Sequence, residues 1–318
     1  MDSQDRQDEG EGVEYSERVR YIAPINSQNF HMSDTNTDNY ELIIEPSKGL
    51  LRIDWHGLMH YRDLLFLLVR RDFVAQYKQT ILGPLWFIIQ PLLTTLVFTV
   101  IFGSVAKIPT DGIPPMLFYL CGMCVWSYFA ACFSSISTTF ITNANLFGKV
   151  YFPRIILPMS VVVSKLIAFG IQMATFLVFL GYFIFFTKSD AQVHITAWIW
   201  ALPLLLLLSA ALGLGVGLWI SALTTKYRDL VHLATFLTQL WMYATPVVYP
   251  VSQIPERWLW LAALNPMTGI VEAFRKAFLG AGEASVYLLG MSVCITLFIL
   301  LTGLILFSRA EKTFVDTV

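Results

Sequence analysis

The chain has 318 residues, of which 56% are hydrophobic and only 14% are charged. Soluble globular domains contain about 45–50% apolar and about 25% charged residues, so this composition excludes an ordinary soluble protein and favours one embedded in a membrane. The formal net charge of −1 supplies no strong field for attracting nucleic acid, and we expect no nucleic-acid partner.

The first segment, residues 1–49, is acidic and polar. Eleven Asp and Glu residues stand against three Arg residues up to Glu45, with few apolar residues between them. A segment of this kind cannot bury enough apolar surface to form a core. We therefore expect a disordered cytoplasmic tail, and its lack of a basic start followed by an apolar run argues against a cleaved secretory signal.

The next segment, residues 50–80, contains YRDLLFLLVRRDFVAQYKQT. Its apolar run, 64–69, is too short to cross a bilayer, and basic residues flank it on both sides. This pattern predicts an amphipathic helix in the cytoplasmic membrane interface. The cations either anchor this helix or also meet a phosphorylated lipid as it enters, and the sequence leaves both readings open. They are Arg62, Arg70, Arg71 and Lys78.

Six long apolar stretches follow, each close to the roughly 20 residues that a membrane-spanning helix needs. They are 81–105, 116–138, 155–186, 197–222, 230–248 and 286–307. The sequence therefore predicts an all-α, polytopic membrane protein, with a transmembrane domain over 81–310 and a short cytoplasmic tail over 311–318. The third stretch exceeds the bilayer thickness, so it must tilt or project, and Lys165 within it can snorkel to the interface.

Basic residues predict the orientation, because cytoplasmic loops retain Lys and Arg. Six spans place both termini on one side, and that side has eleven basic residues near the span ends. The other side has five: Lys107, Lys188, Arg257, Arg275 and Lys276. We therefore expect cytoplasmic termini.

Some residues inside the stretches have a predicted structural role. Pro91 lies in the middle of the first stretch and should kink its helix, while the adjacent Gln90 should face protein or a watery path rather than lipid. Three glycines in the fourth stretch have the spacing that lets helix backbones approach closely. All four cysteines lie inside predicted spans, where small apolar helix residues are a better reading than a metal or redox site.

Two segments between the stretches have distinctive patterns. NANLFGKVYFPRIILP, after the second stretch, is basic and aromatic, which fits either an interfacial loop or a short helix that docks into a partner protein. RWLWLAAL and NPMTGIVEAFRKAFLG, after the fifth, predict two helices too short to span, resting in the outer interface or dipping in as re-entrant helices. Asn265 as N-cap, Pro266 at the first position and Gly280 as terminator bound the second of these.

Missing motifs limit the functional class. The chain has no G-x-x-x-x-G-K-[ST] loop, so it has no Walker A site of its own. The stretches also lack the Asp, Glu and Arg residues of ion-coupled transporters, and no paired carboxylates or His cluster suggests an enzyme. Transport would therefore be driven by another protein.

The run from Tyr61 to Gly103, the NANLFGKVYFPRIILP segment and the NPMTGIVEAFR segment resemble the permease subunit of type-2 ABC exporters of lipid-linked polysaccharide. This family is typified by bacterial O-antigen, capsule and teichoic-acid exporters. The likeness runs from about Leu50 to the carboxyl end. It implies a homodimer in the bacterial inner membrane that moves an undecaprenyl-diphosphate-linked glycan outward. Two copies of a separate cytoplasmic ATPase would bind the ATP and Mg²⁺, so this chain would carry no cofactor and catalyse nothing.

The resemblance also assigns roles to residues. A helix seated on the ATPase would include Asn143, Asn145, Lys149, Tyr151, Phe152 and Arg154. The basic residues of 50–80 would mark the side where the lipid enters. The channel wall would include Trp86, Phe87, Gln90, Pro91, Tyr119, Trp126 and Trp241, with aromatic rings stacking on sugar faces. An outer gate, or else an ordinary aromatic belt, would include Trp258 and Trp260.

Two other functions remain open from the sequence. An ABC permease for a drug or another lipid would share the topology but need no channel wide enough for a glycan. A membrane-bound glycan-modifying enzyme or scaffold would need no ATPase, so it would be indifferent to changes at Lys149 and Arg154.

Overall fold

The computed structural model describes residues 61–78, 80–143, 146, 152–186, 193–282 and 285–315. One compact unit, Ile53–Val318, holds all of them. The regular secondary structure of the described residues is all helical, with no strand. The predicted tail over 1–49 and the lead-in before Tyr61 lie outside the described residues.

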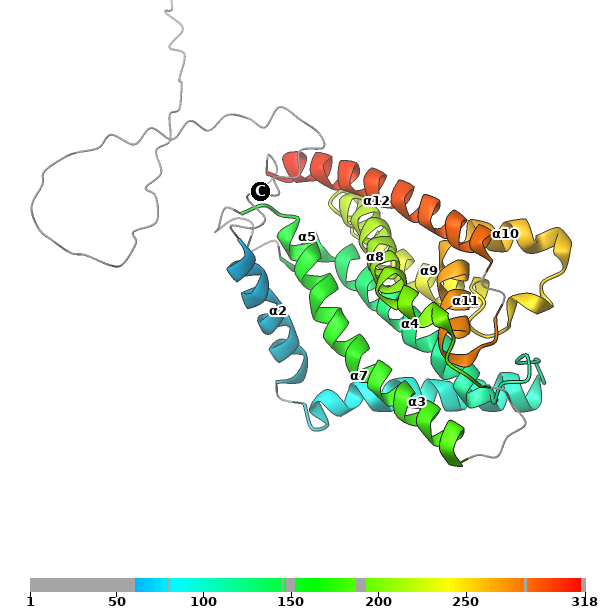
Figure 1. Ribbon diagram of the computed structural model, residues 1–318. Coiled ribbons are helices and arrows are strands. Elements are labelled where there is room, and N and C mark those ends of the chain that lie inside the picture. Colours follow the sequence, from blue (N-terminus) through cyan, green and yellow to red (C-terminus); the bar gives the residue numbers. More distant parts are fainter. Residues whose placement is uncertain are drawn as a thin grey trace, which may run out of the picture. The chain divides into compact units, whose positions relative to one another are not determined.

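The amino-terminal helices come before the central bundle. Helix α2 (Arg62–Tyr77) lies alongside the first half of α7 (Figure 1). A 3₁₀ turn, η1 (Gly83–Leu85), leads into α3 (Trp86–Phe98), which continues through Pro91 and passes into a π-helical segment, η2 (Thr99–Val105). The π-helical geometry starts at Thr99, eight residues after Pro91, and not at the proline itself.

The bundle itself is built on α4 (Pro115–Ser137), whose residues are mostly buried. A short helix, α5 (Thr139–Thr142), follows it. Around α4 pack α7 (Ile156–Phe186) and α8 (Leu202–Thr224), which starts after η3 (Ala197–Ala201). The last helix, α12 (Val286–Val315), packs along α8. Helix α4 is therefore covered by other helices on several sides and forms the centre of the core.

The fourth-stretch glycines explain how closely α8 packs. A Cβ on Gly213 would lie 2.9 Å from the Cβ of Cys132, and one on Gly217 would lie 2.7 Å from the Cβ of Ile136, both on α4. A Cβ on Gly215 would lie 2.9 Å from the backbone of Leu300 on α12. The three glycines therefore let α8 approach two helices at once, as the small-residue spacing predicts.

Five helical segments are long and apolar enough to cross a membrane among the described residues. They are Gly83–Val105, Pro115–Ser137, Ile156–Phe186, Ala197–Thr224 and Val286–Glu311. The sixth predicted span, 230–248, forms a shorter helix, α9 (Leu230–Ala244), of 15 residues. At 1.5 Å per residue α9 is about 22 Å long, less than the hydrocarbon thickness. The count of six full spans is therefore not confirmed, and the difference lies in α9.

The segment after α9 contains the two short helices that the sequence predicts. Two 3₁₀ turns, η4 (Val251–Gln253) and η5 (Glu256–Trp258), lead to α10 (Leu259–Leu264) and α11 (Pro266–Leu279). The Oδ1 atom of Asn265 accepts from the backbone N–H of Met267 at 3.1 Å, and Gly280 has φ of 71°. The predicted N-cap and terminator of α11 are confirmed. Nearly all of α11 is buried against α4, α8 and α12, so it is covered by protein.

Candidate functional site

The basic residues of α2 lie on its exposed surface. Arg62, Arg70, Arg71 and Lys78 are all exposed, while Leu68 packs into a buried cluster with Ile156 and Leu157 of α7. Arg71 donates to Asp72 with both Nε and Nη2, at 2.9 and 2.8 Å. Arg62 lies 3.7 Å from Asp63. Adjacent carboxylates thus partly neutralise two of the four cations.

The predicted ATPase-docking segment is described at three of its six residues. The side-chain oxygen of Asn143 accepts a hydrogen bond from the Arg71 guanidinium at 3.5 Å. Phe152 is buried in the cluster around Leu68, and Arg154 lies two residues before the start of α7. The guanidinium of Arg154 donates to the backbone carbonyl of Glu311 at 2.9 Å and lies 3.8 Å from its carboxylate. The remaining three, Asn145, Lys149 and Tyr151, lie outside the described residues. The two ends of this segment are therefore tied to α2 and α12.

Four predicted channel residues line one pocket of about 230 Å³. Trp86, Phe87, Gln90 and Pro91 of α3 form one side of it, and α2, α4 and α7 complete it. Its polar residues include Lys165 and Gln172 of α7. We call it the lysine pocket. Gln90 thus lines a pocket formed with other helices, although it is also exposed at the surface of the chain.

The structure places two other predicted channel residues in the core. Tyr119 is 0% exposed and Trp126 is 3% exposed, both on α4. The indole of Trp126 packs on Phe129 with ring centroids 5.2 Å apart, and Tyr119 packs on Phe98 and Phe118. Neither residue reaches a surface of the chain in this arrangement, so they do not form a wall here.

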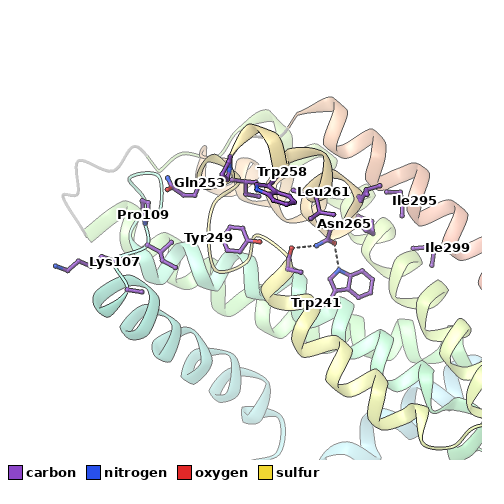
Figure 2. Close-up of a pocket in the computed structure, with 18 residues that line it drawn as sticks. Lys107, Pro109, Trp241, Tyr249, Gln253, Trp258, Leu261, Asn265, Ile295 and Ile299 are labelled. Atoms are coloured by element: carbon purple, nitrogen blue, oxygen red, sulfur yellow. Dashed lines mark hydrogen bonds between the residues drawn. The ribbon is translucent and has the colours of Figure 1, made fainter.

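The last of the predicted wall residues, Trp241, lines a larger cavity of about 1080 Å³ with Tyr249 and Trp258 (Figure 2). We call it the aromatic cavity. Asn265 lies at its centre and links two elements: its Oδ1 accepts from the Trp241 indole at 2.9 Å, and its Nδ2 donates to Thr245 at 2.9 Å. Burial raises the pKa of the Tyr249 hydroxyl above its ordinary value, so this group stays neutral.

Polar groups for a ligand come from the rim of the aromatic cavity, since the Asn265 amide is already engaged. Gln253 and Lys107 line it and are exposed. Trp258, predicted as an outer gate, is one of the lining residues, whereas Trp260 is exposed outside it. Aromatic faces with one available amide, Gln253, and one cation, Lys107, suit a sugar or another partly apolar ligand better than an ion.

Helix α11 contains a buried ion pair that the sequence analysis does not predict. Glu272 and Arg275 are each 1% exposed and share a 2.8 Å hydrogen bond. Arg275 also donates to the carbonyl of Val247 at 2.7 Å and stacks 3.7 Å from the ring of Phe118. The i, i+3 spacing of Glu272 and Arg275 in the sequence is compatible with an ion pair on one face of a helix. Because Arg275 is buried and paired, it is not one of the exposed basic residues that the orientation argument compares.

No group of three or more His, Cys, Asp or Glu residues could hold a metal ion in the part of the chain that the structure describes. The four cysteines are free thiols, three buried and Cys294 exposed. The lysine pocket and the aromatic cavity, both formed by described residues of the apolar helices and the segments between them, are candidate ligand sites.

Comparison with known proteins identifies this bundle. The sequence profile described as "ABC-2 type transporter" matches residues 63–279, more than half of the chain. The O-antigen export system permease protein RfbA of Klebsiella pneumoniae is 27% identical over 262 residues, which are 82% of this chain and 97% of the relative. RfbA of Myxococcus xanthus is 30% identical over 225 residues, 70% of this chain and 82% of the relative. With its long apolar helices in the matched region, this chain belongs to the ABC-2 type transporter family.

Proposed function

We propose that the chain is the permease subunit of an ATP-driven exporter that moves an O-antigen-like polysaccharide, linked to undecaprenyl diphosphate, across the bacterial inner membrane. The likeness to RfbA proteins over 82% of the chain carries this proposal, because it extends over nearly the whole length of those relatives. Both termini would lie in the cytoplasm. The aromatic cavity would then be on the outer side, where aromatic rings can contact sugars as they leave.

The partners proposed are a second copy of this chain and two copies of an ABC ATPase. The family profile supports the ATPase, since the chain has no Walker A loop of its own. The exposed apolar face of α9 supports the second copy. It includes Phe236, Leu240 and Tyr243, and within α9 only Ala234 is buried. A second copy would cover a helix that is too short to span the membrane alone.

Depletion of the protein tests the transported substrate. We expect lipid-linked glycan to accumulate on the cytoplasmic face while its synthesis continues, because synthesis does not need this chain. The measurement is surface glycan by antibody labelling, beside lipid-linked glycan extracted from membranes. Normal surface glycan after depletion would contradict the proposed function, whereas restored labelling on re-expression would support it.

Replacing Arg154 with Ala tests the contact with the ATPase. We expect ATP hydrolysis stimulated by lipid-linked glycan to fall several-fold, because the tether from the docking segment to Glu311 is lost. Basal hydrolysis by the ATPase should persist. The measurement is the ratio of stimulated to basal hydrolysis in the purified permease–ATPase complex in nanodiscs.

The matched control is Glu311→Ala, which removes the carboxylate 3.8 Å from Arg154 but keeps the backbone carbonyl that accepts at 2.9 Å. This variant should retain most of the stimulation, because the 2.9 Å hydrogen bond from Arg154 to the Glu311 carbonyl remains in place. Unchanged stimulation in Arg154→Ala would show that the tether has no part in coupling.

A further inference from the structure

Lys165 lies on a membrane-spanning helix without a counter-charge. It follows the start of α7 by nine residues, about 13 Å along the helix, and belongs to the apolar segment Ile156–Phe186. Its side chain is half-buried, and no carboxylate forms an ion pair with it among the described residues. Ionisable residues within membrane-spanning segments are rare and commonly mark a binding site or a substrate path.

The pocket around Lys165 has both polar and apolar walls, and no acidic residue is among its described lining residues. The lysine pocket is also lined by Gln76 of α2, by Gln90 of α3, and by Ser127 and Gln172, where Gln172 is buried and donates to Ser127 at 3.5 Å. No Asp or Glu is among the described residues that line the pocket. The pocket therefore holds one positive charge with several hydrogen-bond donors, an arrangement that favours an anion.

The volume of the pocket limits the size of the anion that it can bind. Its volume of about 230 Å³ lies below the range of about 300–1,000 Å³ typical of drug-sized ligands, so a small head group fits and a sugar chain does not. Apolar side chains complete the wall, among them Trp86 and Phe169. A hydrocarbon chain attached to the anion could follow this apolar surface into the membrane.

We propose that the lysine pocket binds the phosphate or diphosphate group of a membrane lipid, with Lys165 as the cation that pairs with it. Gln90 and Gln172 supply hydrogen-bond donors, and Gln76 of α2 also lines the pocket. That this lipid is the exported substrate rests on the proposed function, whereas the binding of a lipid phosphate does not. The same chemistry could come from an ordinary anionic phospholipid, and the experiment separates the two.

The experiment measures lipid binding to the purified full-length chain by native mass spectrometry. The probes are undecaprenyl diphosphate, undecaprenyl monophosphate and phosphatidylglycerol. Lys165→Gln should weaken undecaprenyl diphosphate binding about tenfold or more, because a hydrogen-bonded charge is lost, and Lys165→Arg should retain most of it. The control Lys226→Gln removes a lysine of the α8–α9 loop, outside the pocket, and should change nothing. Equal affinity in Lys165→Gln and the wild type would overturn the proposal.

A second measurement uses the wild-type chain and so does not depend on how the variants fold. Undecaprenyl diphosphate should slow the acylation of Lys165 by a membrane-permeant ester, read by peptide mass spectrometry, while Lys226 reacts at its usual rate. Unprotected Lys165 at saturating lipid would overturn the site. Protection by all three lipids to the same extent would uphold a lipid-phosphate site but assign it to phospholipid instead of substrate.

These outcomes are distinguishable from failure of the proposed function. If depletion abolishes surface glycan but Lys165→Gln binds and exports normally, the exporter stands and the lysine pocket is not its lipid site. If the lipid binds through Lys165 but depletion leaves surface glycan normal, the site stands and the proposed function fails.

Discussion

Replacing Glu272 with Met should lower the free energy of unfolding by about 3–5 kcal/mol, because it leaves the guanidinium of Arg275 buried without its counter-charge. Both side chains are 1% exposed, so water cannot replace the lost partner. Arg275 would keep only its bond to Val247 and its contact with Phe118. Its Nε already has no acceptor among the described residues, so there is little left to compensate. The measurement is unfolding in mixed micelles by SDS titration.

Two controls isolate the effect of the unpaired charge. The double variant Glu272→Met, Arg275→Met removes both charges and should recover most of the stability, losing about 1–3 kcal/mol for the unpaired Val247 carbonyl. Asp63→Asn breaks the pair with Arg62 on α2, where the side chains are 75% and 91% exposed, and should cost less than about 1 kcal/mol. A double variant as unstable as Glu272→Met would show that packing, and not the lone charge, explains the loss.

The position of this pair also matters for the helices around it. Arg275 joins three elements: its own helix α11, the Val247 carbonyl in the segment after α9, and Phe118 on α4. A Cβ on Gly122 would come within 3.0 Å of its Nη2, so α4 has a glycine where the guanidinium passes. Movement of the segment after α9 relative to α11 would therefore have to break a buried, charge-assisted hydrogen bond.

Local signals in the sequence predicted some elements well. The bounds of α11 follow from Asn265, Pro266 and Gly280, because caps and left-handed terminators act over a few residues and need no tertiary information. The end of α9 also had a local signal that hydropathy obscured. Apolar residues continue to Val248, but Thr245 precedes a proline and has extended geometry, so the helix ends at Ala244.

Other features depend on tertiary packing and could not be predicted from the sequence. Helix α4 is apolar around its whole circumference, so no pattern could show that Tyr119 and Trp126 face the core. The burial of Arg275 similarly depends on α4 and on the segment after α9, which pack against its own helix. For the lysine pocket, Gln90 was identifiable as a polar residue at membrane depth, but its assembly with Lys165 and Gln172 required α3 and α7 to be placed together.

Replacing Gly303 on α12 with Ala should destabilise the protein by about 1–3 kcal/mol or more, because there is no space for the added methyl group. The new Cβ would lie 2.5 Å from the carbonyl oxygen of Gly215 on α8 and 3.1 Å from Trp219. The first of these is a backbone atom, so no side-chain rotation can relieve the clash. The two helices must therefore separate, and the hydrogen bond from Trp219 to Thr302 at 3.1 Å would be strained with them.

Gly290, on the same helix, provides the matched control. A Cβ there meets nothing within 4 Å, so Gly290→Ala should stabilise α12 by about 0.5–1 kcal/mol through the lower entropy of the unfolded chain. The same substitution is thus expected to have opposite signs at two positions of one helix. SDS titration of both variants measures this difference, and a stabilising effect at both positions would show that α8 and α12 do not approach as closely as Gly215 and Gly303 indicate.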